Sequence, residues 1–96
     1  MPFTWEISIN KRGAGGDNGF VYDPAELDVS IGDQIFWTNN DDNEHWPGIA
    51  GNPTYFMADP IAPDSPSSTF VPGVAGTVNY IDSLHPNAPG AKIVVS

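Results

Sequence analysis

Glycine and proline recur so often in this chain that a long helix has almost nowhere to form. Each of the two residue types occurs 10 times among 96 residues. Glycine destabilises a helix interior and proline removes a backbone donor, whereas both residues supply turns. The sequence therefore favours short extended segments joined by turns, and we expect an all-β protein.

Alternating side chains locate the first of these segments. From Phe3 to Ile9, every second residue is large and apolar, which is the pattern of a strand with one buried face. Further strands are predicted at residues 20–22, 27–31, 34–39, 69–71, 76–80 and 91–96. The Gly32-Asp33 turn predicts that segments 27–31 and 34–39 form a hairpin. Residues 11–19 are expected to be a flexible turn region, and residues 48–68 a long proline-rich loop with room for one helical turn.

This set of strands predicts the architecture. Seven or eight short strands, with turn signals about every 8 to 12 residues, are typical of a Greek-key β-sandwich. A chain of 96 residues has the length of one domain, so residues 1–96 are expected to fold as a single unit. Trp5, Trp37 and Tyr80, at strand positions, are expected to lie in its core.

Charge and composition exclude several classes of function. Twelve acidic residues face three basic ones, and the net charge is −9. Such a chain repels phosphate backbones and anionic lipids, so nucleic-acid binding is not expected. No apolar run approaches the roughly 20 residues that span a bilayer, so membrane insertion is not expected either. The absence of cysteine excludes disulfides, thiolate metal ligands and iron–sulfur clusters.

Two histidines are the candidate metal ligands. His45 and His85 each occupy a loop at the end of a predicted strand, with acidic residues nearby, and such loops can meet at one pole of a sandwich. The acidic run Asp41, Asp42 and Glu44 just before His45 is expected to be a solvated loop. Met57, in the long loop, is expected to be a packing residue.

Three stretches of the chain resemble the cupredoxins, the family of plastocyanin, amicyanin and azurin. Residues 76–95, with His85 followed by a glycine and a final apolar strand, resemble the copper loop of that family, whose pattern is C-x-x-H-x-x-M. Residues 22–41, followed by His45, are similar to the family's lead-in to its first histidine. Phe70-Val71-Pro72-Gly73 matches the turn before its aromatic strand. The resemblance implies a cupredoxin-like sandwich that binds copper.

The departures from the family pattern concern the ligands. Asp82 stands at the cysteine position, His85 matches the second histidine, and Ala88 stands at the methionine position. Trp46 follows the first histidine, where the family often has asparagine. The resemblance therefore implies a thiolate-free metal site of His45, Asp82 and His85. The fourth ligand is left open between water, Glu44 and a backbone oxygen.

This ligand set indicates which metals the site would hold. Imidazole and carboxylate suit Cu(II) and also Zn(II), whereas Cu(I) is poorly served without thiolate. We expect copper, with electron transfer or copper carriage as the function and a redox or copper-transfer protein as the partner. By resemblance to exported cupredoxins, a periplasmic or extracellular location is expected.

Two other functions remain open at this stage. A metal-free cupredoxin-fold interaction module would keep the sandwich without the chemistry. A small metalloenzyme would also use two histidines, a carboxylate and an open position. The sequence offers neither a general base beside the site nor a substrate pocket, so an enzyme is not expected.

Overall fold

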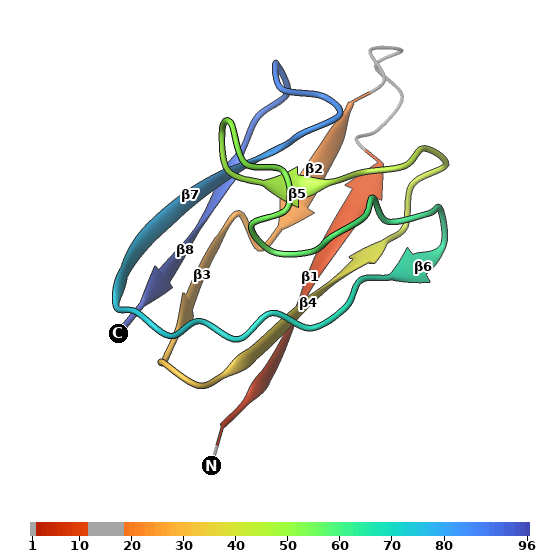
Figure 1. The fold of residues 1–96 in the computed structure, drawn as a ribbon. Helices are drawn as coiled ribbons and strands as arrows, with labels where there is room; N and C mark the ends of the chain where they lie inside the picture. Colours follow the sequence, from red (N-terminus) through yellow and green to blue (C-terminus); the bar gives the residue numbers. More distant parts are fainter. Residues whose placement is uncertain (1, 12–18) are drawn as a thin grey trace.

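The computed structural model describes residues 2–11 and 19–96, and its strands form two layers that pack face to face (Figure 1). The strands are β1 Thr4–Lys11, β2 Phe20–Asp23, β3 Glu26–Val29, β4 Gln34–Asn39, β5 Pro47–Gly48, β6 Ser65–Pro66, β7 Gly76–Asp82 and β8 Ala91–Val95. Within these described residues none is helical, and hence none belongs to a helix that could cross a membrane. The prediction of an all-β, cupredoxin-like sandwich of seven to eight strands is confirmed.

Each layer is a mixed sheet of four strands. The first sheet has the order β2-β1-β4-β6 and the second the order β3-β8-β7-β5. In the first sheet β1 pairs parallel with β4 and antiparallel with β2. In the second sheet β8 pairs parallel with β3 and antiparallel with β7. The chain passes from the first sheet to the second between β2 and β3, at a cis peptide bond between Asp23 and Pro24.

The predicted hairpin of residues 27–31 and 34–39 is wrong, because these segments lie in different sheets. β3 pairs with β8, and β4 pairs with β1. The turn between them is held by Asp33, whose carboxylate accepts hydrogen bonds from the backbone N–H groups of Ser30 and Phe3. Gln34 then donates its N–H to the Phe3 carbonyl at 2.8 Å. These bonds direct the chain to β1 instead of back along β3.

The segment 69–71 is only partly extended as predicted. It makes a single β-bridge, between Phe70 and Ile35, and Pro72 has no N–H with which to continue the ladder. Residues 48–68 form the expected long loop, which contributes the two-residue strand β6 and contains no helical turn. Most of the turn region predicted at residues 11–19, namely residues 12–18, lies outside the described part of the chain.

Alternating side chains of both sheets fill the space between them. Trp37 and Tyr80 lie in this core as predicted, whereas Trp5 is only half-buried at its edge. The buried apolar residues are Ile7, Ile9, Phe20, Tyr22, Leu27, Val29, Ile35, Trp37, Phe56, Met57, Ile61, Tyr80, Ile93 and Val95. Seven aromatic rings continue this packing, edge to face, from Phe20 to Phe70. These rings are Phe20, Tyr22, Tyr80, Trp37, Phe56, Tyr55 and Phe70.

The core can be tested with two isoleucines that lie close in sequence. Ile35 is fully buried and Ile31 is half-exposed. We expect Ile35→Ala to lower the free energy of unfolding by about 2 to 5 kcal/mol, because it leaves a cavity between the sheets. The control Ile31→Ala should change it by less than about 0.5 kcal/mol. Urea unfolding measures both values, and equal losses would contradict this account of the core.

Candidate metal centre

The loop that follows β4 delivers His45 to one end of the sandwich. Asn39, the last residue of β4, is fully buried and organises this loop. Its side-chain amide donates to the carbonyls of Asn43 and Ile61, at 2.8 Å and 3.1 Å, and its side-chain oxygen accepts the Asp41 N–H at 2.9 Å. His45 itself exchanges two backbone hydrogen bonds with Ile61. The imidazole is thereby held in place, with 1% of the residue exposed.

Asp82, the last residue of β7, faces the His45 imidazole. One carboxylate oxygen, Oδ1, accepts the backbone N–H of Trp46 at 2.8 Å and that of Leu84 at 3.0 Å. The Ser83 N–H also donates to the Trp46 carbonyl at 2.7 Å. These bonds fasten the end of β7 to the residue after His45, so that the side chain of Asp82 is completely enclosed.

The second carboxylate oxygen is where the two histidines meet. Asp82 Oδ2 lies 2.5 Å from His45 Nδ1 and 3.0 Å from His85 Nδ1. The three ligand atoms lie within 4.8 Å of one another. The side chain of His85 is 39% exposed, so the group is reached from solvent on the His85 side. The structure thus brings together the three residues proposed from the sequence.

Asp41 is a fourth member of the cluster that the sequence analysis assigned to a solvated loop. It is buried, and its carboxylate lies 2.7 Å from His45 Nε2. Its neighbours Asp42 and Glu44 are exposed as expected, and Asp42 forms an ion pair with Lys11. The signal that could have identified Asp41 is its position four residues before His45, but an acidic run alone does not reveal which member turns inward.

Hydrogen bonds within the cluster oppose the effect of burial on its acid–base groups. Burial would lower the pKa of His45, but hydrogen bonds to Asp82 and Asp41 raise it above the ordinary histidine value. Burial would raise the pKa of Asp82, but the hydrogen bonds from His45 and the Trp46 N–H lower it. The pKa of Asp41 is lowered in the same way, against its burial, by His45 and the Asp42 N–H. Without metal the cluster therefore favours an imidazolium between two carboxylates.

Apolar side chains enclose the inner side of the cluster. The ring of Phe20 lies 4.2 Å from that of His45 and 5.5 Å from that of His85, measured between centroids. Trp46 is half-buried and donates its indole N–H to the Met57 carbonyl at 3.2 Å. Met57 is buried in the core, which confirms its predicted packing role. Ala88, at the methionine position of the family pattern, donates its N–H to the His85 carbonyl.

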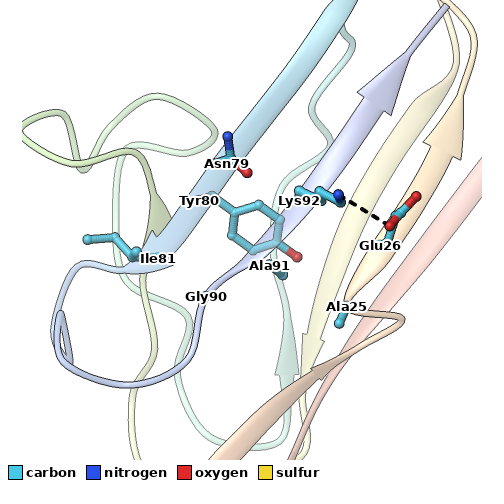
Figure 2. Close-up of a pocket in the computed structure, with 8 residues that line it drawn as sticks. All are labelled: Ala25, Glu26, Asn79, Tyr80, Ile81, Gly90, Ala91 and Lys92. Carbon is cyan, nitrogen blue, oxygen red and sulfur yellow. Dashed lines mark ion pairs between the residues drawn. The ribbon is translucent and has the colours of Figure 1, made fainter.

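A groove of about 480 Å³ opens between β7, the start of β8 and the residue before β3 (Figure 2). Its walls include Asn79 and Ile81, and Lys92 lies at one end, 3.4 Å from the carboxylate of Glu26. None of the cluster residues lines this groove. The candidate metal ligands are therefore gathered elsewhere, at the end of the sandwich.

Comparison with solved structures shows which fold this is. A purple cupredoxin from Nitrosopumilus maritimus superposes with a TM-score of 0.72 at 23% identity, over 95% of this chain and 98% of the other. Amicyanin from Paracoccus versutus superposes with a TM-score of 0.69 at 18% identity, over 97% and 81%. A variant of amicyanin in its reduced state gives 0.73 at 23% identity, over 97% and 82%. The chain therefore has the cupredoxin fold.

Sequence comparison alone does not identify relatives. No model of a known protein family matches the chain, and no curated protein matches it.

The acid–base balance of the cluster predicts how stability of the metal-free protein depends on pH. The pKa of His45 is raised on folding. The contribution of His45 to the free energy of unfolding is therefore complete below its unfolded pKa of about 6.5, and it is lost as pH rises through its folded pKa. The lowered pKa values of Asp41 and Asp82 add a second loss as pH falls below about 3.9.

Urea unfolding of the metal-free protein across this pH range measures the effect. We expect the free energy of unfolding to fall as pH rises above about 6.5. His45→Gln, which carries no titrating group at that position, should flatten this part of the profile. A free energy that rises with pH over the same interval would contradict the charge arrangement described here.

Proposed function

We propose that this protein binds copper through His45 Nδ1, His85 Nδ1 and Asp82 Oδ2. The observation that carries the proposal is the convergence of both histidine nitrogens on one carboxylate oxygen, at 2.5 Å and 3.0 Å. Two of the three side chains are buried, and a buried charged cluster is costly unless it is paired or holds a metal. The cupredoxin fold supports copper as the ion.

The donor set fits a thiolate-free copper site. Donor atoms bound to a common ion at about 2.0 to 2.2 Å lie at most about 4.4 Å apart. The distances from Asp82 Oδ2 to the two histidine nitrogens, 2.5 Å and 3.0 Å, are within this limit. Two imidazoles and a carboxylate suit Cu(II) and also accept Zn(II). Because the chain has no cysteine, Cu(I) would lack the soft ligand that it prefers.

Asp41 has a separate role in this proposal. A histidine ligand commonly donates its second ring N–H to a carboxylate, which fixes the tautomer and orients the ring. Asp41, 2.7 Å from His45 Nε2, is placed to accept that N–H. His45 Nδ1 is then the nitrogen left to bind the metal, on the side where Asp82 and His85 lie.

Copper bound here would supply a one-electron redox couple, and the carboxylate in place of a thiolate would favour its oxidised form. The exposed edge of His85 is the side on which a partner protein would approach. We therefore propose electron transfer or copper carriage, not catalysis, with a redox or copper-transfer protein as the partner. An exported protein, periplasmic or extracellular, is the location proposed with this function.

A metal-free interaction module is the second candidate, and one observation favours it. In the described cluster the polar atoms already pair with one another, because His45 contacts a carboxylate at each ring nitrogen and Asp82 Oδ1 accepts two backbone N–H groups. Such a cluster is satisfied without an ion. A direct measurement of metal binding separates the two candidates.

Titration with Cu(II) is that measurement. We expect one Cu(II) per chain and an almost colourless protein, because no thiolate-to-copper charge transfer exists without cysteine. Asp82→Asn should abolish tight binding, and Asp41→Asn should weaken it about 10- to 100-fold. Asp42→Asn is the matched control, since Asp42 is exposed, and should bind as the wild type does. No binding would support the metal-free module, and equal binding by all three variants would show that copper binds outside the cluster.

The position of residue 82 can be tested by restoring a thiolate. Because Asp82 Oδ2 faces both histidine nitrogens, Asp82→Cys should place its sulfur beside them, and the copper-loaded variant should gain an intense visible charge-transfer band. Adding Ala88→Met should shift this band if residue 88 lies at an axial position. Visible absorption and EPR spectra measure both effects. If the Asp82→Cys variant binds copper without this band, residue 82 does not face the metal.

A further inference from the structure

At the end of the sandwich opposite the metal cluster, β1 and β4 begin and β8 ends (Figure 1). Large apolar side chains of the segments at this end, among them Phe3 and Ile31, are exposed. Two backbone hydrogen bonds join the segments here, from Ile31 N–H to the Ser96 carbonyl and from Gly32 N–H to the Pro72 carbonyl. We call this surface the distal pole. It consists of the exposed residues Phe3, Asp28 and Ile31 and the half-buried Trp5, each of which lines one of the two hollows described next.

Phe3 is the central side chain of the distal pole. It is 67% exposed, and its ring lies 6.0 Å from that of Trp5, at an interplanar angle of 54°. Two hollows lie against it, one of about 340 Å³ beside Ile31 and one of about 270 Å³ beside Trp5 and Asp28. A large exposed aromatic side chain with a hollow on two sides offers a partner protein both apolar area and a shape into which its own side chains can pack. These are properties of a contact surface.

The backbone under these rings is fixed by the buried carboxylate of Asp33. Its Oδ1 accepts the Phe3 N–H at 3.0 Å, and its Oδ2 accepts the indole N–H of Trp5 at 3.0 Å. The Ser30 N–H donates to the same Oδ2 at 2.9 Å. These hydrogen bonds lower the pKa of Asp33, with those from Ser30 and Phe3 acting most strongly. The surface is therefore preorganised, which reduces the ordering cost of binding.

The charges around the distal pole favour a cationic partner. The exposed carboxylate of Asp28 lines the hollow beside Trp5, and neither hollow is lined by a described lysine or arginine. Lys11 and Lys92 pair instead with Asp42 and Glu26. The faces of Phe and Trp rings attract cations, and the whole chain carries a net charge of −9.

We propose that the distal pole docks a basic segment of a partner protein, with an arginine or lysine side chain over Phe3 and Trp5 and beside Asp28. The breadth of the surface favours a protein segment over a free organic cation. Ile31, which is 52% exposed, lines the hollow that Trp5 and Asp28 do not reach. A small cation beside Asp28 would leave Ile31 in water, whereas a peptide could also place an aliphatic side chain against Ile31. This inference does not depend on metal binding.

The test uses the full metal-free chain and three probes at low ionic strength. These are a blocked peptide of alternating arginine and leucine, the same peptide with glutamate for arginine, and butylguanidinium. Backbone amide shifts in NMR spectra locate each probe. We expect the basic peptide to shift residues of the distal pole and to bind more weakly as salt is added, while the acidic peptide does not bind. Equal affinity for butylguanidinium and the basic peptide would overturn the assignment to a protein segment.

Two variants connect the binding to the named side chains. Phe3→Ala and Asp28→Asn change exposed residues, so the fold is retained, and each should weaken the basic peptide about three- to tenfold. Val21→Ala is the matched control, because Val21 is an exposed apolar residue on β2, and should leave the affinity unchanged. Losses equal to the control, absence of binding, or shifts confined to the metal cluster would overturn the proposal.

Discussion

The carboxylate of Asp82 is the contact on which one end of this molecule depends. Its Oδ1 accepts the Trp46 and Leu84 N–H groups, and its Oδ2 lies against both histidines. The end of β7, the loop after β4 and the following turn are thus joined through a single side chain. Removing the carboxylate would leave two backbone donors and a buried imidazole without their acceptor, which is costly in a low-dielectric interior. The same group therefore holds the local structure together and also supplies the carboxylate ligand of the copper site that we propose.

Much of the architecture could be predicted from the sequence, because strand patterning is a local property. The alternation in β1 and the β-branched run of β8 indicate strands wherever they later pair. Pairing is not local. Nothing near Gly32 and Asp33 reveals that Asp33 binds the Phe3 N–H, about 30 residues earlier in the chain, and sends the next strand to the other sheet. A turn sequence alone predicts a hairpin, and the long-range hydrogen bond decides otherwise.

The candidate site shows the same division. His45, Asp82 and His85 were proposed from their order along the chain and from the cupredoxin pattern, and the structure brings their ligand atoms within 4.8 Å. Asp41 could not be separated from Asp42 and Glu44 by sequence. All three belong to one acidic run, and only the path of the loop around Asn39 turns Asp41 inward to His45 Nε2. Which acidic side chain becomes buried is decided by tertiary contacts, which a composition argument does not contain.

The parallel pairings of the two sheets have a consequence for how the molecule assembles. β1 joins β4, and β3 joins β8 near the end of the chain, so both sheets require contacts between segments distant in sequence. High contact order of this kind slows folding, because long loops must close before any strand pair is rewarded. His45, 37 residues before Asp82, follows β4 of the first sheet, and Asp82 ends β7 of the second, so the two residues meet only where the sheets are packed together. An ion that needs both residues would then bind the native state alone, and by mass action would protect a slowly formed structure from unfolding.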